Sequence, residues 1–574
     1  MAHPIRSAAA GAVALLLFVP IRASSQGGGG TVACTGEIVS RVDIRPSPPP
    51  FSGTARKWQS AARAAGLHHA TTQAGVIQAF LSLAPGQPCT EFRRAESERV
   101  LRAQPFLSDA IVFVLSDTGG RVAVLVTTTD EVPVLVSARF RGIAPESFGL
   151  GNENLFGSAL RLEGHIERGR AYRTALSARL QQDALFGRPY RFIVDGGRFQ
   201  LGQELAVELE HPFFTDLQRI SWHGGFFSRD DYVRFARPAR DPLGLQVRDR
   251  RWDASGLLRV FGTKTVALLG GAVTGRQFDP AAAGIVIDDT GFRADTGTTL
   301  RRRYSMFRAT RIGVTTGLRR VSFRNVNGFD ALDGSQDVAS GMMLGLHAAH
   351  GLAQSGERDF LLSSAGYAGL SSRNALLATF AQFEARRDPT SGKWDSMIGS
   401  ARTAFYWGSA PGVVLAVANE LSGGSHSLLP LQLTFSDRTG GMLGYGNSPL
   451  AGAVRNVVRA EARWSGEAMV RKADVGIATF GEFGTLWAGD VPYGSNATRA
   501  TVGVSLLAAY PSRAKRLYRA DIGVPLSRGG VNGGRIEVRF SSVDRTQGFW
   551  KEPGDVARAR TGTDPSRLFA WPSQ

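Results

Sequence analysis

The segment Leu160–Glu167 reads LRLEGHIE, with apolar or small residues at its even positions and charged residues or histidine at its odd positions. Successive side chains of a β-strand point to opposite faces, so this segment is expected to form a strand with one apolar and one polar face. The same alternation appears in residues 172–180 and 204–210 and continues through about 385 residues to Phe540. A soluble sandwich would turn the charged face to solvent, whereas a membrane barrel would turn it to the lumen.

The length of the alternating region favours the barrel. A soluble β-repeat protein would show a fixed sequence period, and the sequence shows none. In hydrocarbon, unpaired strand edges are too costly, so a membrane sheet closes on itself. Strands of about ten residues, with their turns and loops, would give about 16 strands over this region. The prediction is a mainly β protein with a transmembrane antiparallel β-barrel of about 16 strands in residues 145–543.

The amino terminus indicates export. Residues 1–25 begin with a short region containing Arg6, continue with the apolar run Ala8–Phe18 and end in small residues. These are the marks of a secretory signal peptide, with cleavage expected before Gln26. The apolar run is too short for a membrane helix, which needs about 20 residues.

Composition is consistent with an exported, strand-rich chain. It has 69 glycines, 33 phenylalanines and only 20% charged residues, yet its net charge is +18. A basic chain can bind nucleic acid, but an exported one rarely meets any, and the sequence has no nucleic-acid-binding signature. Arginines that line a lumen or face anionic lipid account for the charge better. Nucleic acid is therefore not expected among the partners.

A small soluble domain is expected before the barrel, in residues 34–135. Its order of a strand, helices and then two strands would make an α+β domain. The expected segments are a strand at 37–44, helices at 54–65, 76–83 and 90–103, and strands at 110–115 and 121–128. Thr54 and Thr90 are suited to cap the helices that follow them.

Cys34 and Cys89 are the two cysteines of the chain, and both lie in this domain. An oxidising periplasm permits a disulfide between them, and closing a loop of that length would contribute about 4 kcal/mol in the chain-entropy model. Neither cysteine has a neighbour at metal-ligand spacing, so no metal site is expected.

Several segments resemble outer-membrane proteins of the BamA/TamA superfamily. Residues 83–86 (LAPG), 106–110 (FLSDA) and 122–126 (VAVLV) are similar to the polypeptide-transport-associated (POTRA) domain that precedes those barrels. Residues 151–157 resemble the start of the first barrel strand, and residues 517–526 and 535–540 resemble the last two strands. The resemblance implies a bacterial outer-membrane barrel with a POTRA-like domain in the periplasm.

Residues 438–464 resemble the long sixth extracellular loop of that superfamily and the strand after it. In the superfamily this loop folds into the lumen and carries a hydrophobic-Arg-Gly-aromatic signature. The corresponding residues here are Gly441, Met442, Leu443, Gly444 and Tyr445, with Leu443 in place of the arginine. The alternative is an ordinary glycine-rich turn between strands.

In the superfamily the loop arginine pairs with an acid in a wall strand patterned Phe-x-Asp-x-Gly. The matching residues here are Phe480, Glu482 and Gly484, so an acid is retained. A buried Glu482 without a cation would be costly, and Arg438 or Arg455 is expected to pair with it. If neither does, the loop is expected to be mobile.

Residues 544–574 extend beyond the last strand, where the superfamily usually stops. This tail contains Phe549, Trp550, Phe569 and Trp571. We expect the tail to be disordered in the periplasm. The alternative is that it plugs the barrel or docks onto it.

The sequence contains no nucleophile elbow, phosphate loop or metal-ligand cluster, so neither catalysis nor a cofactor is expected. The resemblance implies a protein that assists insertion or translocation of client proteins at the outer membrane. Its implied partners are outer-membrane lipid, client polypeptides, and periplasmic chaperones or accessory proteins. A single N-terminal domain departs from the several found in the main assembly factor. Two alternatives remain open: a passive pore or structural surface antigen, and a soluble periplasmic β protein.

Overall fold

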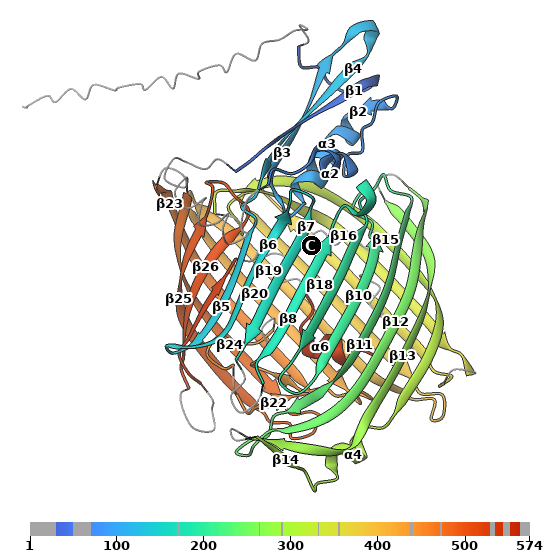
Figure 1. The fold of residues 1–574 in the computed structure, drawn as a ribbon, viewed down its shortest axis with the longest axis vertical. Helices are drawn as coiled ribbons and strands as arrows, with labels where there is room; N and C mark the ends of the chain where they lie inside the picture. Colours follow the sequence, from blue (N-terminus) through green and yellow to red (C-terminus); the bar gives the residue numbers. More distant parts are fainter. Residues whose placement is uncertain are drawn as a thin grey trace, which may run out of the picture.

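In the computed structural model, an N-terminal domain stands over one end of a large β-barrel (Figure 1). We call that end of the barrel the domain end and the opposite one the far end. The expected signal peptide in residues 1–25 and the expected helix at 54–65 lie outside the described residues. The structure describes residues 30–49, 70–168, 173–262, 265–288, 291–330, 332–353, 356–436, 440–446, 448–470, 473–527, 534–542 and 551–562.

The N-terminal domain is a sheet with strand order β2-β1-β4-β3, covered by helices. β1 runs parallel to β4, and the other two pairings are antiparallel. The Thr90 hydroxyl caps α3 by accepting a hydrogen bond from the Arg93 amide. The elements are β1 (Thr35–Ser47), α2 (Ala74–Ala79), β2 (Pro88–Thr90), α3 (Glu91–Arg102), β3 (Leu107–Ser116), η1 (Thr118–Gly120) and β4 (Val122–Asp130).

The expected order of elements in this domain was incomplete, and its assignment as a POTRA-like domain is not confirmed. The described residues contain an additional strand, β2, which separates α2 from α3. Cys89 of β2 is joined by a disulfide to Cys34, with their Cα atoms 5.0 Å apart. This link holds β2 along the start of β1, where Thr35 pairs with Thr90, so the residues just before α3 form the edge of the sheet.

The barrel is built from consecutive antiparallel strands, and its last strand, β27, pairs with its first, β5, to close the sheet. A small strand, β14 (Phe292–Ala294), only extends β13, and α4 (Thr299–Arg303) lies beside it at the far end (Figure 1). The barrel strands are β5 (Val134–Arg141), β6 (Ala144–Leu155), β7 (Leu160–Glu167), β8 (Ala175–Gln182), β9 (Arg191–Arg198), β10 (Gln203–His211), β11 (Ile220–Phe235), β12 (Leu243–Phe261), β13 (Val266–Ile287), β15 (Phe307–Asn327), β16 (Ser335–Gly351), β17 (Phe360–Ser371), β18 (Ala375–Arg387), β19 (Trp394–Ala410), β20 (Val413–Ser425), β23 (Val454–Val470), β24 (Ala473–Trp487), β25 (Ala497–Ala509), β26 (Leu517–Pro525) and β27 (Glu537–Ser541). A short helical turn, η2 (Leu185–Gly187), joins β8 to β9.

The prediction of about 16 strands was wrong: within the described residues, twenty strands close the barrel, without counting β14. Two of them, β5 and β6, begin at Val134 and Ala144, before the expected barrel start at residue 145. The others exceed the estimate because several strands are short and turns at the domain end are tight. β7, β8 and β9 have eight residues each, and β19 and β20 are separated by only two residues.

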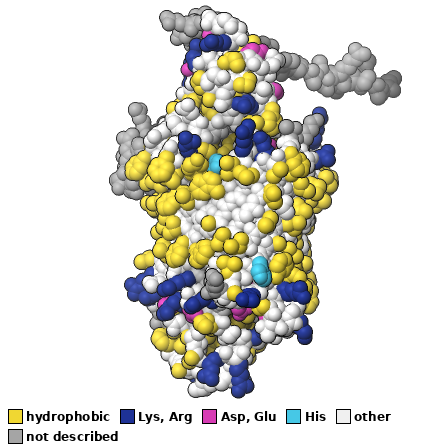
Figure 2. Space-filling model, turned by 90° about the vertical axis from the view of Figure 1, so that its right-hand side faces the viewer, with side chains coloured by type: hydrophobic (Ala, Val, Ile, Leu, Met, Phe, Trp, Pro, Cys, Tyr) yellow, Lys and Arg dark blue, Asp and Glu magenta, His cyan; other side chains and the backbone are white. Residues whose placement is uncertain are grey.

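The two faces of the wall differ in polarity. On β16, the outward Met342, Leu344 and Leu346 are between 36% and 53% exposed, whereas His347 and Ala349 are at most 3% exposed. Figure 2 shows hydrophobic side chains over the side of the barrel, with Lys and Arg side chains gathered below this zone and near the N-terminal domain. An apolar outer face around a polar interior is the arrangement of a membrane-spanning barrel.

Helices do not supply a membrane span in the described part of the chain, where none is long and apolar enough to cross a bilayer.

Candidate functional site: the lumen loop and its anchor

The described residues between β20 and β23 (426–436, 440–446 and 448–453) lie against the inner wall of the barrel, and we call them the lumen loop. It contains a two-strand pairing of β21 (Leu433–Thr434) with β22 (Ala451–Gly452). Its apolar side chains pack onto β23 and β24. This cluster consists of Phe435, Met442, Tyr445 and Leu450 from the loop with Val457 and Leu486 from the wall.

The expected signature residues are the part of the loop that bonds to the wall. The Leu443 amide donates a hydrogen bond of 2.8 Å to Glu482 Oε2, and the Leu443 carbonyl accepts one of 2.8 Å from Thr501 Oγ1. The fully buried Tyr445 donates its hydroxyl to the Ala500 carbonyl at 3.0 Å. The segment is therefore a docked lumen contact with partners on two strands, β24 and β25.

Glycines on the wall make room for the loop. A Cβ at Gly484 would collide with Met442 Sδ and would lie 2.7 Å from Phe435 Cε1. A Cβ at Gly523 of β26 would lie 2.6 Å from Leu443 Cδ2. Gly444 itself has φ of +86°, a backbone conformation that favours glycine. The glycine of the Phe-x-Glu-x-Gly pattern thus serves close packing between loop and wall.

The cation that pairs with Glu482 is neither of the two expected. Arg438 lies outside the described residues, and Arg455 instead binds Glu420 at 3.0 Å and Asp555 at 2.9 Å. Glu482 is paired with Arg459 at 2.6 Å. The physical reason is hairpin register, because Arg459 stands directly opposite Glu482 on the paired strands β23 and β24.

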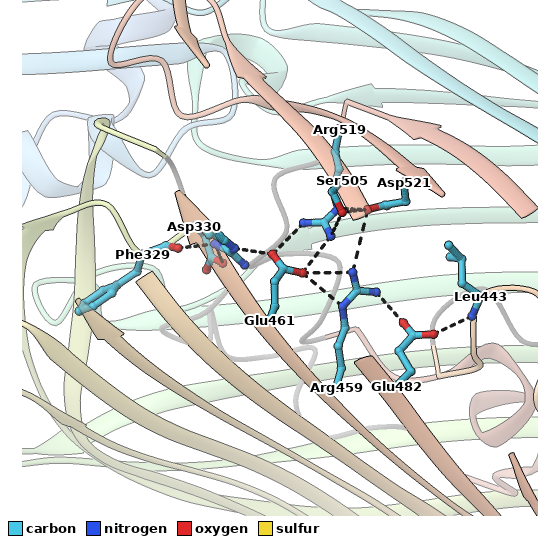
Figure 3. A network of polar contacts seen from close by, with 10 residues as sticks. Phe329, Asp330, Leu443, Arg459, Glu461, Glu482, Ser505, Arg519 and Asp521 are labelled. Atoms are coloured by element: carbon cyan, nitrogen blue, oxygen red, sulfur yellow. Dashed lines mark hydrogen bonds and ion pairs between the residues drawn. The ribbon is translucent and has the colours of Figure 1, made fainter. Parts of the chain in front are cut away.

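The Arg459–Glu482 pair is one end of a buried wall network (Figure 3). Glu461 forms ion pairs with Arg459 at 3.1 Å, with Arg463 at 2.5 Å and with Arg519 at 2.8 Å. Arg519 also contacts Asp521, which accepts the Ser505 hydroxyl at 2.6 Å. The network joins four neighbouring strands, β23 to β26.

Sequence reasoning missed this network although a signal for it existed. Arg459, Glu461 and Arg463 alternate along one strand and therefore share a face. Phe480 also belongs to the arrangement, because the Arg459 guanidinium lies 4.1 Å from the centre of its ring. The expected Phe480, Glu482 and Gly484 therefore each contact either the lumen loop or its anchoring arginine.

The lumen loop also contacts the strand that closes the barrel. The Gly444 amide donates to Glu537 Oε2 of β27 at 3.0 Å, and the Gly444 carbonyl accepts from the Arg535 amide at 2.8 Å. We call the β5–β27 pairing the seam. In the described residues the seam comprises five residue pairs, whereas β25 and β26 share nine and β23 and β24 share fourteen.

The N-terminal domain is fixed to the domain end by buried charges. Arg102 of α3 binds Asp337 at 2.9 Å, and Arg516, in the turn between β25 and β26, donates to the Pro105 carbonyl at 3.4 Å. Glu131 Oε2 accepts the Lys515 amide at 3.1 Å, and burial raises the pKa of the Glu131 carboxyl. These contacts place the domain directly on the mouth of the barrel.

One grouping of side chains could hold a metal ion among the described residues, although sequence reasoning found none. Glu208, Glu210 and His223 have ligand atoms within 4.8 Å of one another. Asp253 lies 2.6 Å from His223 Nδ1, and Arg191 binds Glu210 at 2.9 Å. Because Arg191 already neutralises Glu210, the grouping is accounted for as a set of ion pairs.

Comparison with known proteins gives a likeness in overall form. No protein-family model matches the chain, and no curated protein sequence matches it. CdiB from Escherichia coli has 12% identity and a TM-score of 0.45, over 92% of this chain and 93% of that chain. BamA from Haemophilus ducreyi lacking POTRA domains 1–3 has 12% identity and a TM-score of 0.33, over 88% and 84%. BauA, the ferric preacinetobactin receptor from Acinetobacter baumannii, has 10% identity and a TM-score of 0.34, over 75% and 84%.

At these identities and TM-scores the comparisons carry no argument about function. The closed sheet with an apolar outer face and a charged lumen is itself the form of an outer-membrane β-barrel. The soluble periplasmic alternative would have required an open sandwich with its charged face in solvent.

Proposed function

We propose that the protein assists insertion or translocation of client polypeptides at the bacterial outer membrane, with its N-terminal domain in the periplasm. In this proposal it has no catalytic role. Its partners are outer-membrane lipid, client polypeptides, and periplasmic chaperones or accessory proteins that deliver the clients. The resemblance of the loop and strand motifs to the BamA/TamA superfamily motivates the proposal, and the seam carries the physical argument.

The seam joins the chain's first and last barrel strands with five residue pairs, and only the adjacent β26–β27 pairing is as short among neighbouring full strands of the described wall. Parting it would expose the edges of β5 and β27 in the membrane. A client strand could pair with such an edge and satisfy its backbone groups as it enters lipid. The cost of opening is smallest where fewest backbone pairs are lost.

The lumen loop would control that opening. It bonds to Glu482 on β24, inside the wall, and to Glu537 and Arg535 at the closing strand. A docked loop therefore ties β27 to the rigid wall network and favours the closed seam. Release of the loop would remove these bonds before the strands part.

The test is a reversible crosslink across the seam. Ser137 and Ser541 stand directly opposite each other on β5 and β27, so Ser137→Cys with Ser541→Cys changes little but the hydroxyls. Ser322→Cys with Ser340→Cys makes the same change across β15 and β16, a matched pairing in a long stretch of wall. Both variants are produced in the native host and compared in oxidised and reduced cells.

We expect the oxidised seam variant to lower the outer-membrane abundance of client proteins, and reductant to restore it. The β15–β16 crosslink should leave client abundance unchanged. Unchanged export with a closed seam, alongside normal ion conductance of the purified protein, would instead establish a passive pore and refute the proposal.

A further inference from the structure

Part of the C-terminal tail lies inside the barrel, as the alternative of a plugging or docked tail would have it. Its described part, residues 551–562, which we call the tail segment, includes α6 (Gly554–Ala559) and lies in the lumen (Figure 1). Val556 and Ala559 are fully buried. They pack against Ile398 of β19 and against the lumen loop, in a cluster that also includes Leu431, Leu433, Ala453 and Val491.

The wall recognises the backbone of the tail segment. Arg311 donates to the Thr561 carbonyl at 2.8 Å, and Arg276 donates to the Arg558 carbonyl at 3.2 Å and to the carbonyl of Arg560. Glu384 of β18 accepts the Thr561 hydroxyl at 2.9 Å and the Gly562 amide at 3.2 Å. Both donors and acceptors of the tail backbone therefore have partners on the wall.

The wall also recognises acidic side chains of the tail. Arg455 binds Asp555 at 2.9 Å, and the Ser400 hydroxyl lies 3.4 Å from Glu552 Oε1. Asp555 is mostly buried, so its carboxylate is bound in a site of low polarity, where ion pairs are strong.

The arginines that hold the tail have acidic partners on the wall itself. Arg276 binds Asp249 at 2.8 Å, Arg311 binds Asp359 at 2.6 Å and Arg455 binds Glu420 at 3.0 Å. Departure of the tail would therefore leave none of these three arginines without an anion, which is the costly outcome. These ion pairs favour a site that can exist without its occupant.

Space beside the tail segment is already present. A lumen cavity of 690 Å³ is lined by Arg558, Arg560 and Thr561 of the tail together with Arg276 and Arg311 of the wall. The same arginines thus face both the tail and open space.

We propose that this part of the lumen is a binding site for a short polypeptide segment and that the tail segment is its resident, displaceable occupant. The ligand is a peptide that carries a carboxylate followed by small apolar residues, as in Asp555, Val556 and Ala559. The inference rests on the tail contacts alone and does not require that the barrel transports clients.

The experiment separates the tail from a barrel that has already folded. A protease recognition sequence is inserted within residues 543–550 of the full-length chain, and the protein is cleaved after reconstitution into lipid. Fluorescently labelled synthetic peptide 551–562 is then added, with a scrambled peptide of the same composition as the control. A second peptide carries Asp555→Asn, so the barrel is identical in every measurement.

We expect the cleaved tail to exchange with the labelled peptide, and the uncleaved protein to bind that peptide less. The Asp555→Asn peptide should bind about tenfold more weakly, because it loses a charge-assisted bond to Arg455. A tail that stays bound after cleavage and never exchanges would overturn the proposal, as would equal binding of the native, Asp555→Asn and scrambled peptides. These outcomes involve no client and no seam opening, so they are independent of the test of transport.

Discussion

Glu482→Gln keeps the size of the side chain and is expected to weaken docking of the lumen loop onto the wall. Glu482 accepts the Leu443 amide at 2.8 Å and is itself paired with Arg459. A hydrogen bond to a charged group contributes about 1.5–3 kcal/mol, and a neutral amide acceptor recovers about 1 kcal/mol of this. Because Arg459 keeps Glu461 as a partner at 3.1 Å, most of the remaining cost falls on the loop contact. We estimate a loss of about 1–2 kcal/mol in docking, a factor of about 5–30.

Hydrogen exchange of residues 440–446 measures this docking directly, since the Leu443 amide is the donor. Exchange in this segment should become about 5–30 times faster in Glu482→Gln, because it occurs from the undocked loop. Glu163→Gln is the control: Glu163 is another acid of the wall, paired with Arg161 and His165, and lies on β7. Equal exchange in the wild type and Glu482→Gln, or an equal change in the control, would refute the anchoring role of Glu482.

Three further predictions concern the N-terminal domain. Cys34→Ser with Cys89→Ser should lower its free energy of unfolding by about 4 kcal/mol, as should reduction of the wild type, with denaturant titration as the measurement. Arg102→Met should weaken docking of the domain by about 3 kcal/mol, since it leaves Asp337 on β16 without its 2.9 Å ion pair, and should speed hydrogen exchange in residues 102–108. Burial raises the pKa of the Glu96 carboxyl, but the bonds with Arg99 have the larger effect and bring that pKa below its ordinary value of 4.5. The ionised carboxylate therefore stabilises the folded domain fully above pH 4.5, and this contribution is lost as the pH falls through the folded pKa. Glu96→Gln should therefore speed exchange of α3 at neutral pH, and the difference from the wild type should shrink as the pH falls below 4.5, after correction for intrinsic rates.

Much of the barrel follows from a period of two. Leu162 and Ile166 alternate with Glu163 and His165 in the sequence, and the structure exposes the first pair on the outer face. Strand number does not follow in the same way, because it depends on how few residues each turn uses. Only Pro411 and Gly412 separate β19 from β20, and the alternation of polar and apolar residues does not show how short such a turn is.

The site shows the same division. The segment 441–445 and the acid at Glu482 were identified from their pattern, but the bond between them uses the Leu443 amide, a group that every residue except proline has. Choosing Arg459 over Arg455 required the register of β23 and β24. The place of the tail segment depends largely on its backbone carbonyls and amides, which carry no sequence signal.

The position of the tail segment limits the order in which the parts of the barrel can assemble. A segment surrounded by the wall cannot pass through paired strands, so it is either enclosed when β27 meets β5 or threaded afterwards through an open end. The N-terminal domain covers one of those ends through contacts of Arg102 and Arg516. If the tail is threaded through the domain end, the N-terminal domain must dock after the tail has entered. The part of the chain that is synthesised first would then reach its final position last.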